Sequence, residues 1–192
     1  ARGQEGLKQM GIEPETPFVC FNARDGVWLR QARPRLTGLY GEWGLVEFRN
    51  SSIKNYLLTA DRFTDLGYYA IRIGKYVSEP IQPPNSRVID YSTEFQSDFM
   101  DVYLSARCAL FVGTNSGMTS LPMIFRRPMA LVNVYPLSQI EYCNQQPGVF
   151  IPKLMYSAEK GRILTFREVM DLGLHHFFLR TQEDRDVYNR LG

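Results

Sequence analysis

Short apolar segments alternate with helical patterns along this chain, and that alternation constrains the fold more than any other feature. The six segments that are typical of strands are Phe18–Phe21, Tyr68–Ile73, Arg87–Ile89, Ala109–Val112, Met129–Asn133 and Val149–Ile151. Strands separated by helices are typical of parallel sheets, because a crossover helix returns the chain to the same edge. The pattern therefore predicts an α/β domain with a mostly parallel sheet and helices on both faces.

Capping residues mark the helices between these segments. Asn50 or Ser51 is the expected N-cap of a helix that Gly67 ends, and Ser97 or Asp98 is the expected N-cap of the next. Apolar residues at helical spacing are expected to pack on the sheet: Ile53, Leu57, Ala60, Phe63 and Leu66 in the first helix, and Phe99, Met100, Tyr103, Leu104 and Ala106 in the second.

Weaker patterns fill the rest of the chain. Arg126-Arg127-Pro128 is expected to end a third helix, and two further helices are predicted over Thr165–Leu172 and Glu183–Leu191. Gln31–Phe48 contains several glycines and two aromatic residues without a clean period. A connection this long is either a functional loop, such as a mobile lid, or a surface excursion.

Composition restricts the class of the protein. A length of 192 residues with 44% hydrophobic and 22% charged residues fits one globular domain over 1–192. A formal charge of +2 argues against nucleic-acid binding. No apolar run reaches the ~18 residues of a transmembrane helix, and Ala1–Met10 lacks the apolar core of a signal peptide. Cys20 and Cys108 lie in apolar runs, which predicts buried thiols in a reducing compartment. Together these features lead us to expect a cytoplasmic protein, with the inner face of the membrane as the alternative location.

Polar residues and glycines follow the predicted strands directly. Because ligands of parallel sheets bind at the carboxyl ends of the strands, these residues are the candidate site. They are Asn22, Arg24 and Asp25 after the first strand; Arg72, Gly74 and Lys75 at the end of the second; Asp90 and Tyr91 after the third; Gly113, Thr114, Asn115, Ser116, Gly117 and Met118 after the fourth; and Asn133 at the end of the fifth.

The glycine-flanked turn Gly113–Gly117 is the most informative of these segments. Its glycines permit close approach of the backbone to a ligand and positive φ, and the N–H groups of a following helix attract anions. Ser116 is expected to add a hydroxyl, although a purely structural turn with Ser116 as an N-cap is the alternative. Pro122 requires that the helix either begins near Ser120 or starts at Ser116 with a kink. The turn matches neither the phosphate-binding loop nor the Gly-x-Gly-x-x-Gly pattern.

Several blocks of this sequence resemble the donor-binding half of GT-B glycosyltransferases, and in particular a bacterial family of surface-carbohydrate glycosyltransferases. The turn with its flanks (VGTNSG, Leu121-Pro122, Arg127-Pro128 and Val132-Asn133) carries the general resemblance. The specific one rests on three blocks, which are Phe18–Asp25 (FVCFNARD), Arg49–Tyr56 with Tyr69–Gly74 (RNSSIKNY and YAIRIG), and Asp101–Asn133. The resemblance as a whole extends over about residues 1–175.

The resemblance implies a Rossmann-like domain that holds a nucleotide sugar for transfer to a glycan or other acceptor, without a metal or other cofactor. It places Ser116, Gly117 and Met118 against the diphosphate or donor sugar, and the Asp90 loop at the base or ribose. Arg72 or Lys75 would neutralise the leaving phosphate, and Asp25 is the candidate base. An N-terminal partner domain, which would hold the acceptor, is expected from another part of the protein or from another subunit.

Two other functions fit the same residues. One is a sugar-nucleotide epimerase or hydrolase, which would need a carboxylate or histidine near Ser116. The other is a non-catalytic module that binds a nucleotide sugar or docks to a partner. His175 and His176 point apart as neighbours on one segment and predict no metal site. Arg24 and Asp25 are a candidate internal ion pair, and Asp98 and Asp101 are expected on a solvated helix face.

Overall fold

A computed structural model describes residues 1–32, 49–138 and 148–176 of the chain. Its six-stranded sheet has the order β3-β2-β1-β4-β5-β6, and every pair of neighbours in it is parallel. The strands are β1 (Phe18–Asn22), β2 (Tyr69–Arg72), β3 (Val88–Ile89), β4 (Leu110–Gly113), β5 (Met129–Val134) and β6 (Gly148–Pro152). The predicted Rossmann-like α/β fold is therefore confirmed, and all six predicted strands are present.

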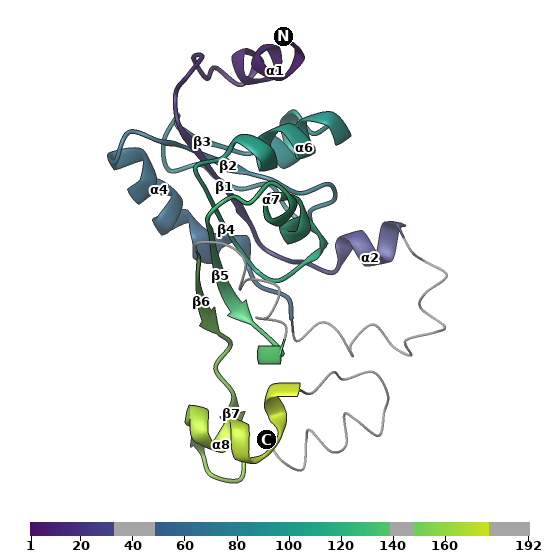
Figure 1. The fold of residues 1–192 in the computed structure, drawn as a ribbon, viewed down its shortest axis with the longest axis vertical. Coiled ribbons are helices and arrows are strands. Elements are labelled where there is room, and N and C mark those ends of the chain that lie inside the picture. Colours follow the sequence, from purple (N-terminus) through teal and green to yellow (C-terminus); the bar gives the residue numbers. More distant parts are fainter. Residues whose placement is uncertain (33–48, 139–147, 177–192) are drawn as a thin grey trace.

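Helices cover both faces of this sheet (Figure 1). The helices are α1 (Arg2–Gln9), α2 (Val27–Ala32), α4 (Leu57–Asp65), α5 (Tyr91–Glu94), α6 (Asp98–Arg107), α7 (Ser120–Ile124) and α8 (Phe166–Asp171), with 3-10 turns η2 (Ile53–Tyr56), η3 (Gly117–Thr119) and η5 (Leu174–His176). The short antiparallel pair β7 (Tyr156–Ser157) and β8 (Arg162–Ile163) precedes α8. None of the helices in these described ranges is long and apolar enough to cross a membrane.

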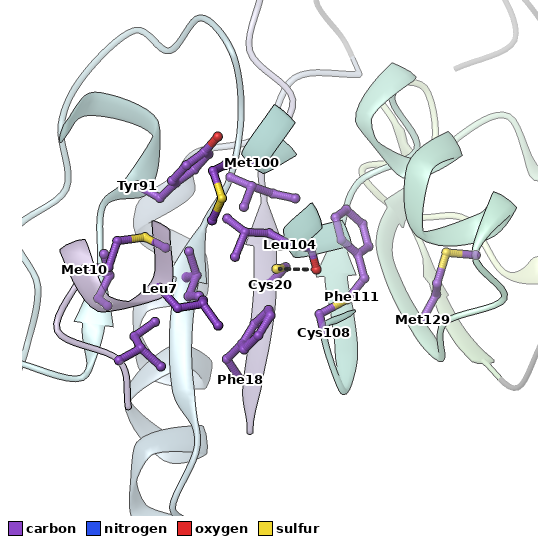
Figure 2. Packing of buried hydrophobic residues seen from close by; sticks show 14 of the residues in the cluster. Leu7, Met10, Phe18, Cys20, Tyr91, Met100, Leu104, Cys108, Phe111 and Met129 are labelled. Atoms are coloured by element: carbon purple, nitrogen blue, oxygen red, sulfur yellow. Dashed lines mark hydrogen bonds between the residues drawn. The ribbon is translucent and has the colours of Figure 1, made fainter. Parts of the chain in front are cut away.

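The alternation of side chains along each strand produces two separate cores. On one face, Cys20, Ile71 and Phe111 pack with Leu7 of α1 and Leu104 of α6. Figure 2 shows the Cys20 thiol directed at the Leu104 carbonyl, at 3.8 Å. On the other face, alternate strand residues pack against η2 and α4; the buried members of that cluster include Val19, Phe21, Ile53, Tyr56, Ala60, Ala70 and Val112. We call these the α6 face and the α4 face.

The helix ends differ in part from the sequence predictions. Ser52, rather than Asn50 or Ser51, caps η2 by accepting a hydrogen bond from the Lys54 N–H. Gly67 follows α4 with φ +89°, as expected for a residue after a helix end. Ser97 is confirmed as the N-cap of α6, because its hydroxyl accepts from the Met100 N–H.

Two of the apolar residues predicted to pack on the sheet do not. Leu66 lies beyond the end of α4 and is 71% exposed. Phe99 is at the surface of α6, where it stacks on Tyr103 and the Arg2 guanidinium lies 4.2 Å from its ring centroid. The inward residues of α6 are Met100, Asp101, Leu104 and Ser105, because that row of the helix lies over the sheet.

The third predicted helix, α7, begins at Ser120, so that Pro122 lies in its first turn and needs no N–H partner. Arg126, at φ +53°, ends it, and the Arg127 Nε donates to the Cys108 carbonyl at 2.6 Å. Thr165 caps α8 in a reciprocal capping box with Glu168.

Cys20 and Cys108 are both buried, as predicted. The possible lid in Gln31–Phe48 lies almost wholly outside the described residues, and the predicted helix Glu183–Leu191 lies entirely outside them.

Candidate functional site

A cavity of about 440 Å³ opens at the carboxyl ends of β1, β2 and β4. Its position is where the strand order reverses, between β1 and β4. The predicted site residues that line it are Asn22, Arg24, Asp25, Gly74, Lys75, Ser116, Gly117 and Met118. Segments that are far apart in the sequence therefore converge here, as expected for residues that follow the strands of a parallel sheet.

Asn22 and Ser116 line the cavity between β1 and the glycine turn. The Asn22 amide donates to the Ile73 carbonyl at 2.7 Å, and the Ser116 hydroxyl lies 3.4 Å from the Asn22 Oδ1. Gly74 has φ +155°, and a Cβ there would lie 3.3 Å from the Asn22 amide nitrogen. Gly74 therefore lets the chain after β2 turn tightly against Asn22.

The glycine turn is held by its own hydrogen bonds. The Thr114 hydroxyl accepts from the Arg24 N–H at 2.8 Å, and the Asn115 amide donates to the Tyr135 carbonyl at 3.0 Å. The Thr119 hydroxyl accepts from the Ser116 N–H at 3.1 Å and donates to the Thr114 carbonyl at 2.8 Å. Thr114 and Asn115 thus fix the turn from inside, and Ser116 presents its hydroxyl to the cavity.

The two glycines of the turn act differently from the prediction. Neither is among the glycines of the described chain that have positive φ. At Gly113 a Cβ would lie 2.8 Å from the Asn22 carbonyl oxygen, so this position requires glycine for the close approach of β4 and β1. At Gly117 a Cβ would meet no atom within 4 Å. Gly117 is therefore open to the cavity and imposes no strain.

Charged residues on the rim are held by specific partners. The two Asp25 carboxylate oxygens accept from the Val27 N–H at 3.0 Å and the Ser78 N–H at 2.9 Å. Asp25 thus positions α2 and the loop after β2. Arg24, its candidate ion-pair partner, instead donates to the Asn50 side-chain oxygen. The Lys75 ammonium pairs with Asp98 at 2.6 Å, which raises the pKa of Lys75 and lowers that of Asp98.

The predicted position of Arg72 and Asp90 at the cavity is wrong. Arg72 is 2% exposed and Asp90 3%, and they form an ion pair at 3.3 Å. The Arg72 guanidinium also donates to the Glu79 carbonyl at 2.7 Å, and Asp90 accepts from the Ile81 N–H at 2.9 Å. Arg72 pairs in register with Phe21, so it lies on the α4 face, opposite to Asn22.

Tyr91 and Asn133 also lie away from the cavity walls. Tyr91 is fully buried on the α6 face, and its hydroxyl donates to Asp101 at 2.9 Å. Asn133, at φ +54° in an irregular part of β5, donates to the Ser51 hydroxyl at 3.1 Å. Tyr91 follows β3 and Asn133 lies near the end of β5, but the side chains of both make internal contacts.

Sequence reasoning missed several residues of the cavity wall. Trp28 and Tyr76, 42% and 39% exposed, line it together with Val77 and Leu121. Asp101 lines it as well, although its position in α6 had suggested a solvated face. Asp101 is 6% exposed and accepts from Tyr91 and from the Gln96 amide at 2.9 Å. The apolar neighbours Met100 and Leu104 were the available signal that this row of α6 is buried.

Burial raises the pKa of the Asp101 carboxyl, against the smaller opposing effect of its hydrogen bonds from Gln96 and Tyr91. Protonation of Asp101 therefore favours the folded state. We expect the free energy of unfolding to lose this contribution as the pH rises from the ordinary value of 3.8 through the raised pKa. Asp101→Asn should flatten this dependence. Urea unfolding of both proteins between about pH 4 and pH 7 measures it, and identical slopes would contradict it.

Comparisons add no assignment to this geometry. The chain matches no protein-family model and no curated protein. In the part of the chain that the structure describes, no group of three or more His, Cys, Asp or Glu side chains could hold a metal ion. His175 and His176 lie in η5, and His175 belongs to no such group.

Proposed function

We propose that this chain is the donor-binding part of a glycosyltransferase and that its cavity binds a nucleotide sugar. The observation that carries the proposal is the position of the cavity, at the point between β1 and β4 where the strand order reverses. In open parallel sheets, ligands bind outside the carboxyl ends of the strands at this point. The volume of about 440 Å³ lies within the roughly 300–1,000 Å³ of ligand pockets.

The chemistry of the walls supports this class of ligand. Trp28 and Tyr76 offer aromatic surface to a planar base or a sugar ring, and Met118 extends the apolar wall. Lys75 and Arg24 bring positive charge to the same opening. A ligand that combines a ring with a diphosphate is complementary to both parts.

The proposed transfer breaks the bond between the anomeric carbon and the diphosphate as an acceptor oxygen forms a bond to that carbon. Negative charge then develops on the departing diphosphate. Lys75 and Arg24, with the Ser116 hydroxyl, would stabilise that charge, and one well-placed donor of this kind contributes ~3 kcal/mol. A partner domain or subunit would supply the glycan acceptor and its base, because both oxygens of Asp25 already accept backbone N–H groups.

Hydrolysis of the same ligand is the second candidate, and Asp101 is the observation that favours it. A buried carboxylate at a cavity with a raised pKa is suited to general acid or base chemistry. Product analysis separates the two reactions, because a hydrolase releases free sugar without an acceptor. A transferase forms a new glycoside only when acceptor and partner are present.

Calorimetric titration with nucleosides, nucleoside diphosphates and nucleotide sugars tests the proposed function. We expect the diphosphate-bearing ligands to bind, and saturation at 100 times Kd to stabilise the fold by ~2.7 kcal/mol. Lys75→Met should weaken these ligands but leave nucleosides unchanged. Arg62→Met is the matched control, since Arg62 is an exposed, ion-paired cation that does not line the cavity. Equal affinity of nucleosides and nucleotide sugars, or no binding of either, would refute the proposal.

A further inference from the structure

A second, smaller cavity opens at the amino ends of the strands, opposite to the candidate site. Its volume is about 150 Å³, and it is lined by Phe18 at the start of β1, Ala109 before β4 and Arg127 before β5. Its other walls come from α1, from the segment 14–17 and from the last turns of α6. We call it the amino-end cavity.

The walls of the amino-end cavity are fixed to the rest of the domain. The segment 14–17 has a proline at each end, and the Pro17 carbonyl accepts a hydrogen bond from β2 at 3.1 Å. Within this segment Glu15 has φ +66°, a conformation that is unfavourable for a residue other than glycine. On the opposite wall, a Cβ at Gly3 would lie 2.2 Å from the Tyr103 ring, so α1 packs closely on α6 (Figure 1). A ligand would therefore meet walls that are already in place.

Two arginines line the amino-end cavity without a carboxylate partner. The Arg127 Nε donates to the Cys108 carbonyl at 2.6 Å, and its two terminal nitrogens have no oxygen acceptor in the described part of the chain. Arg107, in the last turn of α6, forms no ion pair within the same described ranges. Glu15 lines the cavity as well, but no ion pair joins it to either arginine. All three charged groups are therefore available to a ligand.

The size and the charges of the amino-end cavity restrict the class of that ligand. A volume of about 150 Å³ lies below the roughly 300–1,000 Å³ of pockets for drug-sized ligands, so the site suits a molecule smaller than a nucleotide. Guanidinium groups bind carboxylates through paired N–H donors, and a carboxylate accepts hydrogen bonds from an ammonium group. Two guanidinium groups and one carboxylate are complementary to a small molecule with two carboxylates and one ammonium.

We propose that the amino-end cavity binds a free acidic amino acid. Its two carboxylates would accept from Arg107 and Arg127, and its ammonium would donate to Glu15. The amino-end cavity shares no lining residue with the candidate site at the carboxyl ends of the strands. The inference is therefore independent of the proposed function.

Titration of the folded chain with L-glutamate, followed by NMR of the backbone amides, tests this site. Glutarate is the matched ligand, because it has the same two carboxylates and lacks the amino group. We expect the parent to bind glutamate at least fivefold more tightly than glutarate, and Glu15→Gln to remove that difference. Arg107→Met should weaken both ligands about tenfold, since hydrogen bonds between charged groups contribute roughly that much. Glu15 and Arg107 are both exposed, so neither substitution removes a buried contact.

Arg87→Met is the control variant. It removes an exposed cation from the same end of the sheet, directly before β3, at a position that does not line the amino-end cavity. We expect it to bind glutamate as the parent does. No binding of glutamate by the parent, unchanged affinity in Arg107→Met, or equal weakening in Arg87→Met would overturn the site.

Two further comparisons decide the class of ligand and the independence of the site. Equal affinity of the parent for glutamate and glutarate, or an undiminished preference for glutamate in Glu15→Gln, would overturn the assignment to an amino acid. Binding of nucleotide sugars should be unchanged in Arg107→Met. Failure of nucleotide sugars to bind the parent would refute the proposed function and leave this inference standing.

Discussion

Asp90→Asn is expected to destabilise the folded chain by about 3–5 kcal/mol, because it leaves Arg72 as an uncompensated buried charge. Arg72 and Asp90 are 2% and 3% exposed, so the Arg72 charge would remain buried once its partner is neutral. Urea denaturation at neutral pH measures the loss. We also expect the effect to appear in stability rather than in ligand affinity, since neither side chain lines the cavity.

Asp65→Asn provides the control for this prediction. Asp65 pairs with Arg62 at 3.0 Å, but both side chains are exposed, so its loss should cost less than about 1 kcal/mol. Replacement of both partners, as in Arg72→Met with Asp90→Leu, should cost less than Asp90→Asn alone because no charge remains buried. An Asp90→Asn protein as stable as Asp65→Asn would show that the pair is accessible to water.

The two glycines of the turn are expected to fail in different ways when substituted. Gly113→Ala places a methyl group 2.8 Å from the Asn22 carbonyl oxygen. Overpacking of this kind lowers the free energy of unfolding by ~1–3 kcal/mol. Gly117→Val meets no atom within 4 Å and should leave the free energy of unfolding unchanged within about 0.5 kcal/mol. Its side chain would, however, occupy the mouth of the cavity and weaken nucleotide-sugar binding at least tenfold.

Paired measurements of unfolding and binding test this difference. Ser116→Ala is the comparison for Gly117→Val, because it removes one hydroxyl hydrogen bond without adding bulk, and it should weaken binding less than Gly117→Val does. A Gly117→Val protein that binds nucleoside diphosphates as tightly as the parent would show that the turn is structural. A Gly113→Ala protein of parental stability would contradict the close approach of β1 and β4.

The sequence predicted the sheet and the edge that carries the cavity, but it could not predict the face on which each side chain lies. Arg72 and Asn22 both stand at strand ends, and their opposite faces follow from the register in which Arg72 pairs with Phe21. Pairing between distant strands has no local signal. Register therefore decided which predicted site residues reach the cavity.

Helix boundaries and backbone conformation account for the remaining differences. Asp101 was expected on a solvated helix face, but the burial of its row of α6 depends on the neighbouring strands. Gly117 was expected at positive φ because glycine permits that conformation, but the backbone of the turn does not adopt it there. Ser116 and Lys75 were predicted correctly as cavity residues, since both lie in loops that follow strands and both line the cavity.

The central position of β1 has a consequence for how this fold is acquired. β1 is synthesised before its neighbours, yet it needs β2 on one edge and β4 on the other, where Cys20 pairs with Ile71 and Phe111. Both pairings close long loops whose entropy must be lost before the contacts form, so folding is slow relative to that of a helical protein of this size. Until β4 emerges from the ribosome, an apolar strand with an open edge persists in the nascent chain, and chaperone protection should matter most during that interval.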